Sequence, residues 1–488
     1  MRAPTIAPRE WLVVVLGGLS LVFTTWGLAG VQMWSLHTMF AGGVLTLCAA
    51  IAPLPRWWNG RDGEHGNSKN LLRLLKFPFF WFSLLFLIYI TIQGLNPAWE
   101  PTKDSFPWKM KELEPADYIT WLPTGAFGEY AHMNAFRALV NHAAAFMLVW
   151  GLWAGVRRRQ SALILLWAFV VSGVCMALVA ILQKYSGTDS VLWMVQSGNL
   201  KLWGTFFYRN QGAAYLVLVL IASAVLYFYH FNQAERRGQT GGPYMLLFLF
   251  FALVCTSIAM ALSRGGILFG GILALCFLTL VLVRWLSSHS LRSSLLVSVL
   301  VAVLLGAGAY SVFKYVSLEA IEERFGDIGE TIDTADKDSR VIVSKIVWKM
   351  AQEELVFGWG AGTWRYMFPM YQKSYPRIYY HGYNWRKGWH GRRYYKHAHN
   401  DILQFLCEYG IVGCAFLLLA WGYWGFSLLV RSTGNVSAAL ILYVGFAVVL
   451  GHAFLDFLFQ SPAYWVALNG MLCVAVKLLA LHDERARY

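Results

Sequence analysis

The chain has 488 residues, of which 58% are hydrophobic and only 14% are charged. Soluble proteins carry roughly 25% charged residues, so this composition excludes an ordinary soluble globular fold. The formal net charge of +14 is typical of contact with anionic lipids, of basic loops at the cytoplasmic face, or of an anionic substrate.

Apolar stretches of about 20 residues recur along the chain, and each predicts a transmembrane helix. We therefore expect an all-α polytopic membrane protein with about twelve transmembrane helices. The predicted spans are residues 11–31, 36–54, 77–95, 135–155, 161–183, 206–230, 244–262, 266–284, 295–315, 408–430, 436–458 and 463–481. The first span lacks an obvious small-residue cleavage site, so we interpret it as a membrane helix and not as a cleaved signal peptide.

Basic residues in the links between spans predict the orientation. They occur at 56–76, 157–159, 236–237, 284–292 and 431 and in the C-terminal tail, which all fall on one side of the predicted bundle. The positive-inside rule makes this side cytoplasmic and places both termini there. The chain then divides into nine helices over 1–315, with an outer loop at about 96–134, a large outer loop region over 316–407, and three helices with a cytoplasmic tail over 408–488.

The predicted topology brings three arginines and one histidine to the outer face. Arg209 opens the sixth span, Arg264 lies in the tight turn after the seventh, and Arg340 lies on a predicted amphipathic helix of the large loop, which His399 closes. A guanidinium group donates two parallel hydrogen bonds to a phosphate. Each arginine alone also fits a role as a helix-end anchor. Their convergence on the face that carries His399 favours an anion site.

The segment 365–399 is both basic and aromatic. It contains eight Arg and Lys residues and no Asp or Glu, with Tyr and Trp interleaved. Cations among aromatic rings suit an anionic ligand that carries sugar rings, and an interfacial loop on lipid headgroups is the alternative. Nucleic acid also fits this chemistry, but the outer location argues against it. We expect the substrate-binding residues to be Arg209, Asn210, Asn400, Arg365, Arg377, Arg392 and Arg393.

The remaining polar residues do not predict a metal site. His381, His390, His397 and His399 lack the spacing of a compact zinc motif, and no nearby carboxylate or cysteine completes one. The seven cysteines lie in or beside apolar runs without a CxxC pair, so we expect small buried side chains. His452 and Asp456 lie four residues apart, which predicts a helix-packing hydrogen bond, with a supporting role in the site as the alternative.

The run that starts at His399-Asn400, continues for nine residues and ends in Gly410-x-x-Gly413 resembles the signature of the O-antigen ligase and polymerase superfamily of bacterial envelope enzymes. Three more pieces agree in order: Ser263-Arg264-Gly265, Arg340 before its amphipathic helix, and the glycine-rich run 358–362. With Arg209-Asn210 included, the similarity covers about residues 200–420.

The resemblance implies a metal-independent glycosyltransferase of the GT-C type that needs no cofactor. Its donor would be a glycan on undecaprenyl pyrophosphate, and its site would face the periplasm from the bacterial inner membrane, so that the outer loops are periplasmic. The residues matching the family's functional histidine and arginines are His399, Arg264 and Arg340, which we expect to be catalytic. Histidine can take a proton from an acceptor hydroxyl, and the arginines can stabilise the departing pyrophosphate.

An O-antigen ligase, which transfers the glycan to lipid A-core, is the first choice within this superfamily. An O-antigen or exopolysaccharide polymerase and an O-linked protein oligosaccharyltransferase share the same motifs, and membrane lipids are partners in every case. A transporter of lipid-linked sugars and a structural scaffold for envelope assembly lie outside the enzyme class. The chain lacks a Gly-rich phosphate loop with Lys-Ser/Thr, as expected for a donor that is already activated.

Overall fold

The computed structural model describes residues 6–59, 66–101, 113–130, 133–197, 201–288, 339–384, 388–431 and 435–484. Within these ranges, eleven helices are long and apolar enough to cross a membrane. They are α1 (Pro8–Trp26), α2 (Met33–Ile51), α4 (Pro78–Leu95), α5 (Ala135–Gly155), α6 (Arg159–Ser186), α7 (Arg209–Arg236), α8 (Pro243–Met260), α9 (Arg264–Ser288), α15 (Asp401–Arg431), α16 (Val436–Ala453) and α17 (Pro462–Glu484). The predicted all-α polytopic membrane fold is confirmed. The predicted ninth span, 295–315, lies outside the described residues.

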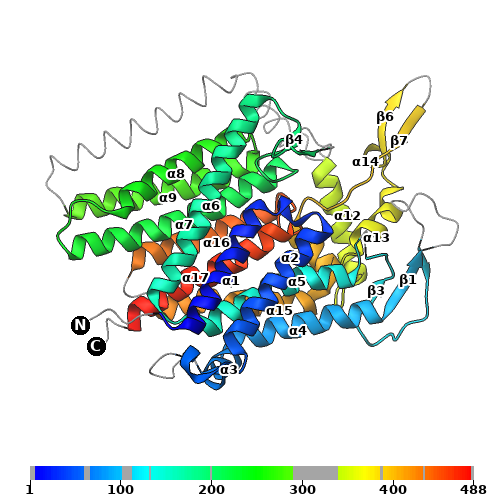
Figure 1. Cartoon of the computed structure of the whole chain (residues 1–488). Coiled ribbons are helices and arrows are strands. Elements are labelled where there is room, and N and C mark those ends of the chain that lie inside the picture. Colours follow the sequence, from blue (N-terminus) through cyan, green and yellow to red (C-terminus); the bar gives the residue numbers. More distant parts are fainter. Residues whose placement is uncertain are drawn as a thin grey trace.

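The helices form one bundle whose centre is made by α7 and α17, because these two helices are buried almost throughout (Figure 1). Outer helices instead expose large apolar side chains, among them Leu275 on α9 and Leu418 on α15. Such side chains are suited to lipid, which is as apolar as leucine itself.

The basic link 157–159 lies at the end of the bundle where α1 begins and α17 ends. The Glu10 carboxylate at the start of α1 accepts the backbone N–H groups of Arg157 and Arg158, before α6. Arg9 donates to the carbonyl of Ala52 after α2, and Arg159 donates to that of Leu481 near the end of α17. These contacts join the start of α1, the α5–α6 link and the end of α17, as the predicted topology requires.

Small elements cover the opposite end of the bundle (Figure 1). They are α12 (Ser339–Glu353), α13 (Trp364–Gln372), α14 (Pro376–Tyr379), the hairpin of β6 (Tyr380–Asn384) with β7 (Gly388–Arg392), and the sheet β2-β1-β3 (Leu113–Pro115, Pro97–Pro101, Gly125–Ala126). The β1–β2 and β6–β7 pairs are antiparallel, and β1 and β3 are parallel. The other elements are η1 (Leu28–Gly30), η2 (Arg56–Asn59), α3 (Asn67–Leu75), and the antiparallel pair β4 (Ser190–Val191) and β5 (Val195–Gln196).

Helix α12 has the predicted amphipathic character. Its buried residues Val343, Ile346, Val347 and Met350 follow the i, i+3, i+4, i+7 pattern of a single helix face. They share a second, smaller hydrophobic core with residues that include Trp364 of α13. This core fixes Arg340, in the first turn of α12, relative to the membrane helices.

Helix α15 begins at Asp401, before the predicted boundary at 408, and is broken at Gly410, where φ is 60° and ψ is −172°. The segment 355–360 fills the break. Its Trp359 and Gly360 N–H groups donate to the carbonyls of Cys407 and Glu408 at 2.8 and 2.9 Å, and the Ile411 N–H donates to Leu355 at 2.8 Å. Backbone groups that a break exposes at membrane depth must be paired, and this segment pairs them.

Candidate functional site

His399 lies in the bend two residues before α15 begins, and its backbone is in the left-handed region with φ 54°. Two contacts fix the chain on either side of it. The Ala398 N–H donates to the Gln404 side chain at 3.0 Å, and the Asn400 side-chain oxygen caps α15 by accepting the Leu403 N–H at 3.0 Å. Asn400, predicted to bind substrate, thus has a structural role that follows from N-capping preference.

The His399 ring faces a buried carboxylate. Its Nδ1 lies 3.5 Å from Oδ1 of Asp456, which follows the end of α16, and this is longer than an ordinary hydrogen bond. The His399 side chain is 27% exposed and that of Asp456 is 3% exposed, so only the histidine reaches solvent. The other Asp456 oxygen accepts the Asn210 amide at 2.5 Å. Asn210 was predicted to contact substrate directly, and here it holds the carboxylate.

Nearby charges keep Asp456 ionised. Burial alone would raise the pKa of this carboxyl group, but the contact with His399 and the charge of Arg340 lower it below its ordinary value. A charged carboxylate beside Nδ1 favours a proton on that nitrogen and leaves Nε2 as the proton acceptor. The pair has the arrangement of a base with its orienting acid.

Aromatic rings frame the pair. The Phe457 ring meets the His399 ring edge-on, with centroids 4.7 Å apart, and stacks on the His397 ring at 4.8 Å. Tyr208 stacks on Phe457 as well, at 5.1 Å, and its hydroxyl accepts the Asn210 amide at 2.8 Å. Burial and the adjacent Asp456 charge raise the pKa of the Tyr208 phenol, which is therefore neutral.

Arg340 lies close enough to this cluster for its charge to act on both Asp456 and Tyr208. Arg264 is the first residue of α9, and the Ser263 hydroxyl caps that helix by accepting the Gly266 N–H at 3.2 Å. Gly265 packs against the His452 ring so closely that a Cβ there would collide with Nε2. The start of α9 therefore abuts α16 one turn before Asp456.

Arg209 is the first residue of α7, and its backbone N–H donates to the Lys201 carbonyl at 2.7 Å. Asn210 on the same turn reaches Asp456, so Arg209 is adjacent in sequence to a residue of the cluster. The structure thus brings the starts of α7, α9, α12 and α15 and the end of α16 together at one end of the bundle.

The basic segment 365–399 does not form one patch. Arg365 on α13 is buried, and its positive charge acts to lower the pKa values of the His397 and Tyr394 side chains. Arg392 lies exposed on β7, with its guanidinium 5.6 Å from the centre of the Tyr379 ring. Arg386 lies outside the described residues. Burial, followed by the charge of Arg365, lowers the pKa of His397 well below its ordinary value, so this histidine is neutral.

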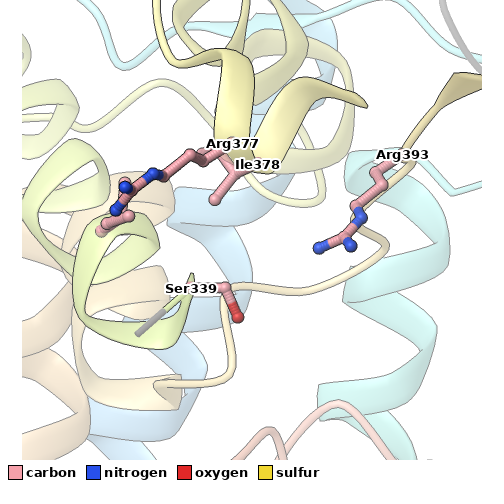
Figure 2. Close-up of a pocket in the computed structure, with 5 residues that line it drawn as sticks. Ser339, Arg377, Ile378 and Arg393 are labelled. Carbon is pink, nitrogen blue, oxygen red and sulfur yellow. The ribbon is translucent and has the colours of Figure 1, made fainter. Parts of the chain in front are cut away.

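Arg377 and Arg393 line a separate pocket of about 420 Å³ together with Ser339, Ile342 and Ile378. Figure 2 shows the Arg377 side chain running from α14 to the first turns of α12, while the Arg393 guanidinium points from the chain after β7 toward the space near Ser339.

Within the described residues, no group of three or more His, Cys, Asp or Glu side chains is arranged to hold a metal ion. The seven cysteines are free thiols. Two of them, Cys48 and Cys175, are exposed, so the prediction that all are buried is wrong for these residues, which face outward from membrane helices.

The interpretation of His452 and Asp456 as a helix-packing pair is wrong, because α16 ends at Ala453 and the Asp456 side chain turns to His399 and Asn210. Sequence reasoning also missed Tyr208, Phe457 and Gln404. Tyr208 and Phe457 adjoin residues that were identified, but no spacing rule links them to His399.

No curated protein matches the chain. The sequence profile of the family described as O-Antigen ligase matches residues 246–418, a stretch that includes Arg264, Arg340 and His399. The resemblance predicted from the His-Asn and arginine motifs is confirmed: residues 246–418 of this multi-pass membrane protein match the O-antigen ligase family, which supports the O-antigen ligase and polymerase superfamily.

Proposed function

We propose that this protein transfers a glycan from undecaprenyl pyrophosphate to an acceptor hydroxyl, and that it acts as an O-antigen ligase with lipid A-core as the acceptor. The observation that carries the proposal is the His399–Asp456 pair, 3.5 Å apart, with the charge of Arg340 acting on Asp456. His399 and Arg340 lie within residues 246–418, which match the O-antigen ligase family, and Asp456 lies beyond that stretch. An O-antigen polymerase and an O-linked protein oligosaccharyltransferase use the same chemistry on other acceptors.

In the proposed reaction, Nε2 of His399 takes the proton from the acceptor hydroxyl, whose oxygen then forms a bond to the anomeric carbon of the donor glycan. The bond from that carbon to the pyrophosphate oxygen breaks, and undecaprenyl pyrophosphate leaves with the bonding electrons. Asp456 stabilises the imidazolium that forms, as the acid partner does in other base–acid pairs. Arg264 and Arg340 hold the pyrophosphate and stabilise its growing charge.

The proposed orientation places this site at the periplasmic face of the bacterial inner membrane. The site lies at the end of the bundle opposite the contacts of Glu10 with Arg157 and Arg158. Basic links of this kind are cytoplasmic in most membrane proteins. The polyprenyl chain would run beside the apolar outer surfaces of the helices, within the lipid.

Reconstituted transfer tests the function. Purified full-length protein is mixed with a glycan on undecaprenyl pyrophosphate and with lipid A-core, without ATP, and the acceptor product is separated by gel electrophoresis. We expect product that is insensitive to EDTA. His399→Ala should abolish it, whereas His390→Ala, an exposed histidine on β7, should leave it intact. Normal transfer by His399→Ala would reject the proposed base, and zinc-restored activity after EDTA would indicate a metal enzyme.

A further inference from the structure

The pocket of Arg377 and Arg393 is built from three elements that lie outside the predicted membrane spans. Ser339 and Ile342 come from α12, Arg377 and Ile378 from α14, and Arg393 from the chain just after β7 (Figure 2). Its volume of about 420 Å³ falls in the range of small-ligand sites and is too small for a polyprenyl chain together with its sugar.

The walls of the pocket are held together by buried hydrogen bonds. The Gln372 side chain, which is 1% exposed, donates to the carbonyl of Ile378 at 2.5 Å and to that of Arg393 at 3.2 Å. The Arg393 N–H in turn donates to the Tyr379 carbonyl at 2.8 Å. These contacts fix the backbones that carry the two guanidinium groups, so the pocket is preorganised.

The described lining of the pocket carries positive charge. Arg377 and Arg393 both line it, and none of the described residues that line it is acidic. Arg393 donates one N–H, from Nη2, to the His381 carbonyl at 3.1 Å. A guanidinium has five N–H donors, so donors remain for an anion. The side chains of Ile342 and Ile378 supply an apolar wall of the kind that accepts the face of a sugar ring.

Two residues of the pocket are near residues of the proposed reaction centre in the sequence, but the pocket is distinct from that centre. Ser339 precedes Arg340, whose charge acts on Asp456, and Arg393 lies six residues before His399 in the sequence. Neither His399 nor Asp456 lines the pocket. A group bound in this pocket would therefore be a part of the substrate that lies away from the bond that breaks and the bond that forms.

We infer that this pocket binds a sugar that carries a phosphate or a carboxylate, as a second anion site separate from the pyrophosphate site. The assignment of the anionic group to a sugar rests on the proposed function. The same chemistry can come from a phosphorylated sugar of the acceptor or from an acidic sugar of the donor glycan, and either would explain two arginines and an apolar wall.

Direct binding tests the site without relying on transfer. The probes are glucose 6-phosphate and glucuronic acid, with glucose as the uncharged control, and saturation-transfer NMR on detergent-solubilised full-length protein measures binding. We expect the two anions to bind and glucose to bind far more weakly. The double variant Arg377→Gln/Arg393→Gln should weaken anion binding about 10- to 100-fold, because hydrogen bonds to a charged group are lost.

Two further variants make the result specific. Lys349→Gln removes one positive charge from the exposed face of α12 and should leave binding unchanged. His399→Ala should abolish transfer yet still bind the anions, so failure of the proposed function and failure of the site are distinguishable. Equal binding by the double variant and the wild type, or equal binding of glucose and glucose 6-phosphate, would overturn the site.

Transfer assays then identify the source of the anion. Acceptors with and without their phosphate groups are combined with donors with and without an acidic sugar. The double variant should raise KM about 10- to 100-fold, with little change in kcat, only for the substrate that supplies the anion. A KM that rises equally for charged and uncharged substrates would show that the arginines stabilise the fold of the pocket and do not bind an anionic group of the substrate.

Discussion

Replacement of Asp456 by Asn should slow transfer without unfolding the protein, because asparagine keeps the shape of the side chain and removes only its charge. At 3.5 Å, an imidazolium and a carboxylate attract by about 1 kcal/mol at the dielectric constant of water and by about 5 kcal/mol at an effective value of about 20. His399 is 27% exposed and Asp456 is 3% exposed, so we take a value between these limits, about 2 to 3 kcal/mol. This corresponds to a fall in kcat of about 30- to 150-fold.

The assay is single-turnover transfer near neutral pH, with KM and the thermal midpoint of unfolding measured alongside. The pKa of Asp456 is lowered, so its contribution to stability is present above the ordinary aspartate pKa of about 3.9 and is lost only as the pH falls below it. The carboxylate is therefore charged throughout the assay range. Asp189→Asn, in an exposed loop, is the matched control and should leave kcat unchanged.

If Asp456→Asn retains kcat within about twofold of the wild type, the attraction between Asp456 and the imidazolium has no role in the transition state. A change confined to the thermal midpoint would indicate that Asp456 only joins the segment after α16 to Asn210.

Three more predictions concern the arginines, the topology and the broken helix. Arg264→Lys and Arg340→Lys should each reduce transfer at least about tenfold, and Ala at least as much, because lysine lacks the planar two-donor fork; full activity of the lysine variants would show that charge alone suffices. Cysteines at Gln160 and Ser374, both exposed, should react with an impermeant thiol reagent from opposite sides of the membrane against the background of the native cysteines, and labelling from one side would refute the proposed orientation. Gly410→Ala should lower stability by at least about 2 kcal/mol in thermal unfolding, because φ is 60° there and a Cβ would strike the backbone, whereas an unchanged midpoint would contradict the description of the break.

The membrane helices could be predicted because each is a long apolar run, and the amphipathic face of α12 could be predicted from its spacing. The break in α15 could not be predicted in the same way. Gly410 is followed by an apolar run that satisfies a hydropathy pattern, and only the pairing of Cys407 and Ile411 with segment 355–360 reveals that the helix is interrupted. Pairing between segments this distant along the chain leaves no local pattern.

The candidate site shows the same limit. His399 could be identified from a motif, but its partner could not, because Asp456 lies four residues after His452 and the rule for helix neighbours pairs those two. The rule fails where α16 ends, at Ala453. The composition of segment 365–399 likewise predicts positive charge but not where each cationic side chain lies. Arg365 is buried, Arg392 is exposed, and Arg377 and Arg393 line the pocket, because composition does not say which way a side chain points.

Counting both products of one turnover decides whether this chain forms a glycosidic bond or moves sugars across the membrane. Donor labelled in its glycan and in its polyprenyl chain is mixed with the purified protein and acceptor. We predict one free undecaprenyl pyrophosphate for each glycan on the acceptor, and neither product with His399→Ala. Glycan that changes membrane side while still attached to undecaprenyl pyrophosphate, with no acceptor product, would show that the chain is a transporter and not a transferase.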